Sequence, residues 1–437
     1  MNQKKYLSQG KKKQMGLWSA ISIGIGGMIG AGIFSILGVA ARISGNALYI
    51  SFLLAGIVAL LSTYSYSKLG AKYPSAGGPV EFLIKGFGNG ILSGGFNILL
   101  WIGYVFVLSL YAKAFAGYAV SFLREDSSGA WMNIFATAVI LVFTAVNFVG
   151  AKAVGRSEFL IVLVKVGILL LFSMIGFFFI KPSFLSFSQW PHISNVFYGT
   201  GLVFVAYEGF GLITNTAEDM KNPQKTLPKA LYISVISVII IYLAVSLTVL
   251  GNLPINAIVK AEDYALAEAA RPFLGLIGFK IIAVAALFST ASAVNATLYG
   301  GANVSYMMAR EGELPRFFER KIWGKGFEGL FITAGLVIIL VNTFNLEGLA
   351  MLGSASFLCV YAAVNISHLR LLKETGAKAF LIWASIIGCF CSLIALIFYE
   401  LQNSPITLIV FGSVFILSFG VEGCFRKYSK RLLKTRT

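Results

Sequence analysis

The chain is a succession of long apolar segments separated by short polar breaks. Each segment holds about 20 mainly apolar residues, the length that an α-helix needs to cross the hydrocarbon core of a bilayer. Twelve such segments can be marked, and they centre near residues 30, 56, 107, 140, 170, 207, 241, 291, 336, 359, 389 and 414. The pattern predicts an all-α integral membrane protein with 12 transmembrane helices.

Two of these segments contain more glycine than a lipid-facing helix needs. Five glycines lie within residues 24–34 of the first segment, and four lie within residues 199–211 of the sixth, beside Glu208. An interior glycine costs a helix about 1 kcal/mol relative to alanine, and irregular backbone at membrane depth is tolerated only where protein surrounds it. We therefore expect both helices to be broken, although small residues spaced four apart also let helices pack closely.

The two glycine-rich segments occupy matching places in the chain. Gly30 and Gly209 are 179 residues apart, and the second lies five spans after the first. Paired interrupted helices in two halves indicate an inverted repeat with a binding site between the halves. The predicted organisation is a cytoplasmic tail (1–15), a first repeat (16–182), a second repeat (190–373), two further spans (378–424) and a second cytoplasmic tail (425–437).

The composition agrees with a membrane location. The 437 residues are 57% apolar and 12% charged, with a mean hydropathy of +0.82, whereas a soluble domain is about 25% charged. The net charge of +17 first suggests a nucleic-acid partner, but 27 Lys and Arg fall on one side of the predicted spans and five on the other. Because basic residues mark the cytoplasmic side, we predict a cell-membrane protein with both termini cytoplasmic, lipids as neighbours and no nucleic acid.

The sequence contains no recognisable catalytic or metal-binding cluster. Its four cysteines lie in hydrophobic segments without a Cys-x-x-Cys spacing, and His192 and His368 are far apart with no acidic cluster beside either. The spans also lack a nucleophile–base pair. We therefore predict no enzymatic activity, no metal and no cofactor.

A broken helix suits the two charges of a free amino acid. The N-terminus of a half-helix offers backbone N–H groups to a carboxylate, and unwound carbonyls accept hydrogen bonds from an ammonium. We assign the first role to four residues of the first span: Gly30, Ala31, Gly32 and Ile33. The ammonium role goes to the carbonyls of Met28, Val205 and Glu208, and the pocket candidates are Phe204, Tyr207 and Gly209.

The side chain of Glu208 has three open interpretations. It can accept a cationic substrate side chain, carry a coupling proton or face a neighbouring polar group. Lys113, in the third span, is expected to pair with an acid or to reach the interface. The loop Leu253–Pro272 contains an alanine-rich stretch, which predicts a short helix that either caps the outer entrance or lies on the surface.

Four stretches carry a resemblance to a known family. The run Gly26–Phe34 resembles the first-span signature of amino acid–polyamine–organocation (APC) superfamily permeases, and Ala217–Ala230 resembles their motif after the sixth span. Leu163–Lys165 and Phe288–Val304 are similar to an archaeal proton-coupled amino acid transporter of that superfamily. The resemblance covers nearly the whole chain. It implies a LeuT-type 5+5 inverted repeat, alternating access and a neutral amino acid cargo without sodium.

Lys165 is the residue that stands out most clearly in the apolar pattern. It lies nine residues past Arg156, which at about 1.5 Å per residue places it roughly 13 Å deep. An ionisable residue there indicates function, unless it snorkels to the interface. The resemblance implies that its ammonium replaces a bound cation and contacts the Gly26 carbonyl and hydroxyls of the eighth span, for which Ser289 and Ser292 are candidates. We predict that protons drive transport through Lys165.

Together these features predict a proton-coupled importer of α-amino acids. Two alternatives within transport stay open, namely a sodium-independent exchanger and a carrier of cationic amino acids or polyamines. A nutrient-sensing receptor would need a signalling domain, and the segment after the last predicted span is only about a dozen residues.

Overall fold

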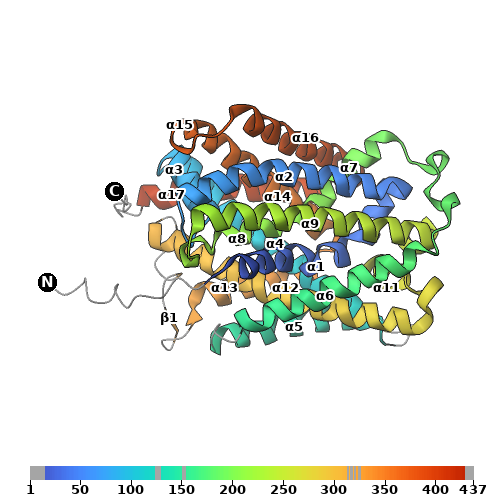
Figure 1. Cartoon of the computed structure of the whole chain (residues 1–437). Coiled ribbons are helices and arrows are strands. Elements are labelled where there is room, and N and C mark those ends of the chain that lie inside the picture. The colour runs from blue at the N-terminus through green and yellow to red at the C-terminus, as the bar shows by residue number, and fades with distance from the viewer. Residues whose placement is uncertain are drawn as a thin grey trace.

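The computed structural model describes residues 15–123, 129–149, 154–312, 314, 318, 321–322 and 326–428. Long helices run roughly side by side between the two ends of the molecule (Figure 1). Most of both predicted tails (1–14 and 429–437) lies outside the described residues, as do some of the basic loop residues, among them Arg124, Lys152 and Arg316.

Helices make up nearly all of the described structure. The long ones are α1 (Leu17–Ser44), α2 (Leu48–Lys72), α4 (Ile91–Val120), α5 (Gly129–Val149), α6 (Val154–Phe177), α9 (Pro223–Asn252), α12 (Arg271–Glu311), α13 (Glu328–Thr343), α14 (Leu346–Arg370), α16 (Ala379–Asn403) and α17 (Pro405–Tyr428). The short ones are α3 (Pro79–Phe87), α7 (Ile193–Val203), α8 (Gly211–Thr214), α10 (Ile255–Ala261), α11 (Ala265–Glu268) and α15 (Leu372–Thr375). The 3₁₀ turns are η1 (Gly45–Ala47), η3 (Pro182–Leu185), η4 (Phe187–Gln189), η5 (Phe204–Phe210), η6 (Ala217–Asp219) and η7 (Glu262–Tyr264), and β1 (Lys321–Ile322) pairs antiparallel with β2 (Gly326–Phe327).

Ten helical runs in the described ranges are long and apolar enough to cross a membrane. The first run, Leu17–Lys72, contains both α1 and α2, which η1 separates. The helix α13 is shorter, at 16 residues. Every one of the predicted span centres falls within a described helix, and the expected all-helical membrane architecture is confirmed at this level.

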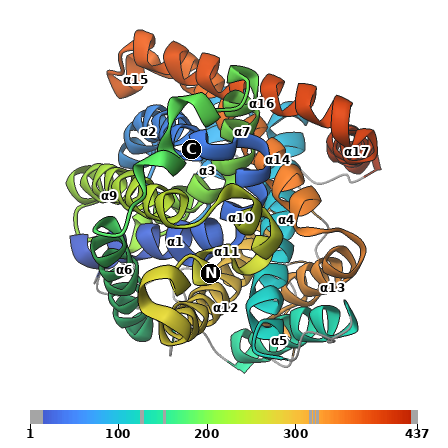
Figure 2. The same ribbon diagram turned by 90° about the vertical axis from the view of Figure 1, so that its right-hand side faces the viewer.

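The helices form a buried centre and an apolar periphery. In the run Leu346–Arg370, 89% of the most apolar window is buried, against 11% in Pro405–Tyr428. The helix α1 packs against α4, α9, α12 and η5, and it lies in the interior when the bundle is viewed end-on (Figure 2). Peripheral α17 turns Ile409 and Ile416 outward. Because soluble proteins rarely expose large continuous apolar patches, this outer face suits contact with lipid.

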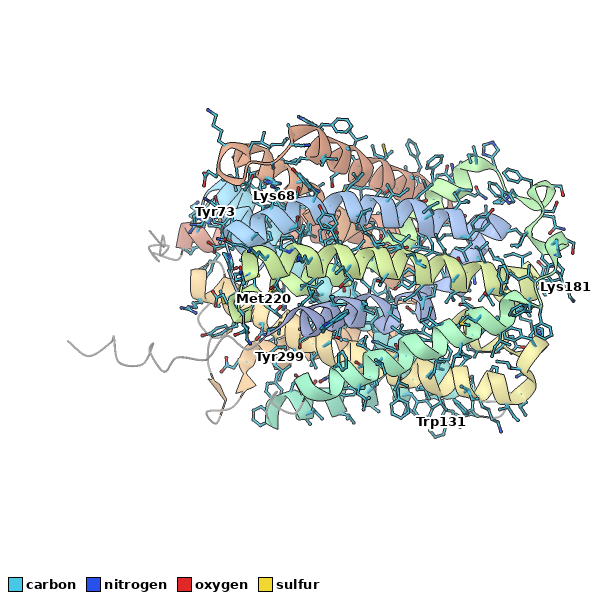
Figure 3. The ribbon with its side chains drawn as sticks, viewed as in Figure 1. Lys68, Tyr73, Trp131, Lys181, Met220 and Tyr299 are labelled. Atoms are coloured by element: carbon cyan, nitrogen blue, oxygen red, sulfur yellow. The ribbon has the colours of Figure 1, made fainter. Side chains whose placement is uncertain are left out.

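The two ends of the bundle are distinguished by the segments that lie there. Lys68 and Tyr73, at the end of α2, lie at one end near α3, which we name the α3 end (Figure 3). Lys181, after α6, lies at the opposite end, where α10 and η7 pack onto α1, and we name this the α10 end. At the α3 end, the Tyr73 hydroxyl donates a hydrogen bond to Glu374.

The prediction that the first span is broken is wrong. The helix α1 continues without interruption from Leu17 to Ser44, through all of its glycines. The physical reason is close packing, because a Cβ on Gly24 would lie 2.3 Å from Ile213 Cδ1, and one on Gly38 would lie 2.3 Å from the Glu262 carbonyl oxygen. These glycines let other elements approach the backbone of α1.

The sixth span departs from a regular α-helix, as its glycines predicted. The helix α7 ends at Val203, the seven residues of η5 continue as a 3₁₀-helix, and α8 resumes at Gly211. A 3₁₀ stretch within a helix has poorer hydrogen-bond geometry and often marks a functional hinge. The interruption is therefore a change of helix type.

The loop at the α10 end contains the short helix that its alanine-rich stretch predicted, α11, and a second short helix, α10, that was not predicted. The helices α10 and α11 flank η7, and Leu266 and Ala267 are fully buried. Because α10, η7 and α11 all pack against α1, this segment covers the end of the bundle and is not a plain surface helix.

Candidate substrate and coupling site

The two predicted site elements, α1 and η5, meet in the middle of the bundle. A Cβ on Gly209 would lie 2.4 Å from the carbonyl carbon of Gly27, and one on Gly32 would lie 2.8 Å from Ala206 Cβ. Real Cβ atoms do not approach so closely, so the backbones touch directly. Glycine at these positions permits the contact.

The carbonyl groups of α1 accept hydrogen bonds from side chains on several neighbouring helices. The Lys165 ammonium of α6 donates to the Gly26 carbonyl at 3.0 Å, and the Tyr242 hydroxyl of α9 lies 2.6 Å from the Met28 carbonyl. The Ser289 hydroxyl of α12 lies 2.9 Å from the Ile29 carbonyl and 2.7 Å from that of Gly30. Further along, the Tyr118 hydroxyl of α4 donates to the Phe34 carbonyl at 3.0 Å. The glycine-rich half of α1 is thus held through its main chain.

Lys165 points into the bundle. Its side chain is only 2% exposed, while the preceding Leu163 and Val164 are 58% and 51% exposed on the opposite side of α6. This burial, with the ammonium on Gly26, excludes snorkelling to the interface. The Ser289 hydroxyl donates a hydrogen bond to a carbonyl of α1. Ser292 is buried on the same helix, α12.

Glu208 lies at the centre of η5 and is 1% exposed. Its main-chain carbonyl accepts a hydrogen bond from the Tyr361 hydroxyl at 2.7 Å, and its carboxylate Oε1 lies 3.4 Å from the Tyr111 hydroxyl. The other oxygen, Oε2, is buried and accepts no hydrogen bond from any described residue. Since a buried polar atom is normally satisfied, this oxygen has capacity for a proton or a cationic group.

Aromatic rings fill the space between η5 and the α3 end. The ring centroid of Tyr361 lies 5.6 Å from that of Phe204 and 5.0 Å from that of Phe210. Tyr66 of α2 joins the same cluster, with its centroid 5.1 Å from that of Tyr361. Tyr207 points elsewhere, and its hydroxyl donates to the Phe52 carbonyl of α2 at 2.9 Å. Of the two aromatic pocket candidates on η5, Phe204 belongs to this cluster and Tyr207 ties η5 to α2.

The predicted carboxylate cradle is not open in this structure. Gly30, Ala31, Gly32 and Ile33 lie within continuous α1, where each N–H group points to the carbonyl four residues earlier. Gly30 also faces Ala293 of α12, since a Cβ on this glycine would lie 2.6 Å from Ala293 Cβ. The expectation of free N–H groups is therefore corrected, because these residues serve helix packing here.

Sequence reasoning missed four tyrosines that bridge the central elements, namely Tyr111, Tyr118, Tyr242 and Tyr361. Tyr104, Tyr111 and Tyr118 are seven residues apart on α4 and are all buried, so they line one face of that helix. Tyr242 contributes to both central elements, because its hydroxyl lies within hydrogen-bonding distance of Met28 in α1 and of the Ala206 carbonyl in η5, at 3.1 Å. The regular spacing on α4 was the available signal. Tyr242 and Tyr361 had none, since single tyrosines occur in many apolar spans.

Lys113 has a structural position. Its ammonium donates to the carbonyls of Val341 and Phe344 at 3.0 and 2.8 Å, at the C-terminal end of α13. A cation there satisfies carbonyls that the helix leaves unpaired and complements the helix dipole. Neither predicted alternative for this residue describes it fully, because its hydrogen-bond partners are main-chain carbonyls.

Apolar helices long enough to cross a membrane enclose buried ionisable groups and main-chain carbonyls, an arrangement that suits a multi-pass membrane transporter. Within the described residues, no group of three or more His, Cys, Asp or Glu is arranged to hold a metal ion. A family model described as amino acid permease matches residues 15–420, so the chain belongs to that family.

Several relatives extend this assignment over most of the chain. An uncharacterized protein of Methanocaldococcus jannaschii is 44% identical over 96% of this chain and 97% of its own length. The inner membrane transport protein YbaT of Escherichia coli is 35% identical over 92% of this chain and 94% of its own length. The methylthioribose transporter of Bacillus subtilis is 30% identical over 80% of this chain and 79% of its own length. The family and the transporter names together support amino acid transport.

Proposed function

We propose that this permease imports neutral α-amino acids by proton-coupled alternating access. The observation that carries the proposal is the buried Lys165 ammonium, bound to the Gly26 carbonyl of α1 next to the contact with η5. An ionisable side chain at that depth is costly and is by default functional. Its ammonium ties a peripheral helix to the central one, so a change in its protonation acts directly on α1.

The proposed membrane topology has twelve spans in a 5+5 inverted repeat. The ten apolar runs support it, since the first comprises two helices and the 16-residue α13 adds one more. On this reading residues 16–182 and 190–373 are the repeats, and 378–424 form the appended pair. The distribution of Lys and Arg supports a cytoplasmic α3 end and cytoplasmic tails (1–15 and 425–437) in a cell membrane.

Substrate capture in this proposal begins with local unwinding of α1. In an α-helix, the N–H groups of Gly30, Gly32 and Ile33 point to the carbonyls of Gly26, Met28 and Ile29. Those three carbonyls already accept side-chain hydrogen bonds. Because the carbonyls stay satisfied when the helix opens, the freed N–H groups can receive the substrate carboxylate at small cost.

Proton coupling follows from the charge on Lys165. The charged form makes a charge-assisted hydrogen bond to Gly26, which is stronger than a neutral one. Loss of the proton weakens this bond and frees α1 to move relative to α6. If two conformations differ in free energy by a few kcal/mol, a change of that size in their relative stability is enough to switch the protein from one to the other.

A cationic cargo is the second candidate, because Glu208 Oε2 is buried without a described hydrogen-bond donor. If a substrate ammonium or guanidinium occupies that position, Glu208→Gln should reduce lysine or arginine uptake far more than alanine or leucine uptake. An equal loss for all four would assign Glu208 to coupling or folding. An unchanged profile would remove the cationic candidate.

The experiment that tests the proposal is uptake by the purified protein in liposomes. Labelled amino acids are offered one at a time, with and without an inward proton gradient. We expect neutral amino acids to accumulate when the outside is acidic and the sodium-free buffer is otherwise symmetrical. Exchange against preloaded substrate at equal rates with and without the gradient would favour the exchanger.

A further inference from the structure

Four buried polar atoms between η5 and the α3 end lack a hydrogen-bond partner among the described residues. They are the Tyr66 hydroxyl of α2, the Ser75 hydroxyl of the loop after α2, Asn215 Oδ1 just after α8 and Asn365 Oδ1 of α14. The side chains of Tyr66 and Asn365 are fully buried. Because a buried polar atom is normally satisfied, four such atoms in one part of the bundle require an explanation.

The four atoms follow one line of contact between α2, α8 and α14, which we name the polar seam. Next to η5, a Cβ on Gly211 would lie 3.4 Å from the Tyr361 hydroxyl and 3.8 Å from Tyr66 Cε1, so the three helices meet there. Asn365 follows Tyr361 by four residues, which places it one turn nearer the α3 end on the same face of α14. The polar seam therefore starts at the proposed substrate site and leads toward the α3 end.

The loop after α2 closes the polar seam at the α3 end. A Cβ on Gly78 would lie 2.5 Å from Thr214 Oγ1 and closer still to Asn215 Oδ1, and the φ angle of this glycine is +46°. Only glycine adopts this backbone conformation readily and leaves room for so close an approach. The end of α2 and the segment after α8 reach the same end of the bundle, as Tyr73 and Met220 show (Figure 3).

Unpaired polar atoms in such a position suit the passage of a zwitterion. An amino acid that leaves the substrate site for the α3 end loses part of its hydration, and polar groups along its way must compensate for that loss. Groups that already hold hydrogen bonds would have to break them first. Oδ1 of Asn215 and of Asn365 can accept a hydrogen bond from an ammonium or from water, and the Tyr66 hydroxyl can donate one to a carboxylate.

We propose that the polar seam is the route by which the substrate leaves toward the α3 end, lined by the four unpaired groups and closed by the loop 73–78. The inference rests on the proposed function, since the cargo must be an amino acid. Opening of the route separates the rings of Tyr66 and Tyr361, whose centroids are now 5.1 Å apart, and lifts the loop from the end of α8.

The test is cysteine labelling of the full chain in nanodiscs, after the four native cysteines are replaced. Single cysteines are introduced as Asn365→Cys and Asn215→Cys, and a membrane-impermeant maleimide is added with or without a saturating mixture of the 20 standard L-amino acids. We expect the mixture to accelerate labelling at both positions about tenfold, because it increases the population of the open form. A reagent that entered from the α10 end would instead be blocked by bound substrate.

Ser367→Cys is the matched control. Ser367 is also fully buried on α14, but its hydroxyl donates to the Phe82 carbonyl of α3 at 3.3 Å and so lies away from the polar seam. Its labelling should stay slow in the mixture. In liposomes, labelling should stop amino acid uptake by Asn365→Cys and leave uptake by Ser367→Cys unchanged. Ser75→Cys, in the closing loop, replaces Asn365→Cys if that substitution in α14 prevents folding.

Three results would overturn the assignment while the proposed function stands. Variants that take up amino acids but whose labelling ignores the mixture would place the exit route elsewhere. Slower labelling in the mixture would show entry through the substrate site, and equal acceleration at Ser367 would show general loosening of α14. If the cysteine-free protein and the wild type take up no amino acid at all, the proposed function itself is refuted, and the exit route with it.

Discussion

At the scale of single residues, the role of each glycine depends on which atoms a side chain at its position would contact. Gly209 touches the main chain of α1, so even a methyl group there would force two backbones apart. Gly412, on α17, has no heavy atom within 4 Å of its ideal Cβ position. Glycine count alone does not separate these cases, and the distance to the neighbouring element does.

We predict that Gly209→Ala destabilises the protein by about 1–3 kcal/mol, the cost of overpacking a well-packed contact. Gly412→Ala is the matched control and should be neutral or stabilising by up to about 1 kcal/mol, because alanine is the better helix former. Chemical or thermal unfolding in detergent measures both. Equal effects of the two substitutions would refute the close contact of α1 and η5.

The site residues could be predicted only where they interrupt a pattern. Lys165 and Glu208 are charges within apolar runs, which is why the sequence singled them out, and both side chains are buried. Tyr242 and Tyr361 are amphipathic residues that fit an apolar run as well as a polar contact. Their hydrogen bonds depend on which helices lie side by side, and one sequence does not contain that information.

At the scale of elements, the segment α10–η7–α11 is fastened to the bundle by charge. Arg42, in the last turn of α1, joins Glu262 of η7 to Glu347 in the first turn of α14. The backbone of η7 also presses on α1, as the close approach at Gly38 shows. Any opening at the α10 end must separate these ion pairs.

Removal of the arginine should therefore loosen this end. We predict that Arg42→Ala increases the labelling rate of a cysteine placed at the buried Leu266, measured with a membrane-impermeant maleimide after the four native cysteines are replaced. Arg271→Ala is the control, because it removes a surface ion pair with Glu268 that contributes little. Unchanged labelling in Arg42→Ala would mean that apolar packing alone holds the segment.

The stability of the same segment should depend on pH through Asp263. Burial raises the pKa of this carboxyl to about 6, and Glu262 adds to the effect, while Lys113 and Arg42 oppose it. The folded protein therefore holds a proton that the unfolded chain releases near pH 4, so stability falls as the pH rises from about 4 to about 6.

Asp263→Asn lacks this titration and tests it. The Tm of the variant minus that of the wild type should be more positive at pH 7 than at pH 4.5. At pH 7 the wild type carries a buried negative charge at Asp263, and the variant does not. Differential scanning fluorimetry at both pH values measures the difference. The same difference at the two pH values would contradict a raised pKa at Asp263.

The positions of the helices were largely predictable from the sequence. Whether α1 is broken or continuous was not. Helix locations followed from hydrophobic segments, since each long segment must be covered by protein or lipid. The glycines of α1 have two physical outcomes, an opened helix or a closely packed one, and the same residues satisfy both. In η5 the outcome is a 3₁₀-helix, and in α1 it is uninterrupted packing.

At the scale of the whole molecule, contacts close both sides of the centre. The aromatic cluster of Tyr66, Phe210 and Tyr361 lies on the side of the α3 end, and the ion pairs of Arg42 lie at the α10 end. Under the proposed alternating-access mechanism, these two sets of contacts would be released one at a time. Lys165 is suited to control the order of these two releases, because it binds α1 between the aromatic cluster and the ion pairs.

The most direct test of this account is amino acid accumulation driven by an imposed proton gradient in liposomes, compared between wild type and Lys165→Ala. We predict that Lys165→Ala abolishes accumulation while it keeps substrate-induced thermal stabilisation. Lys113→Met, which removes a lysine bound to carbonyls at the end of α13, should retain gradient-driven accumulation. Accumulation by Lys165→Ala that still rises as the external pH falls would contradict the account and move the coupling proton to another group.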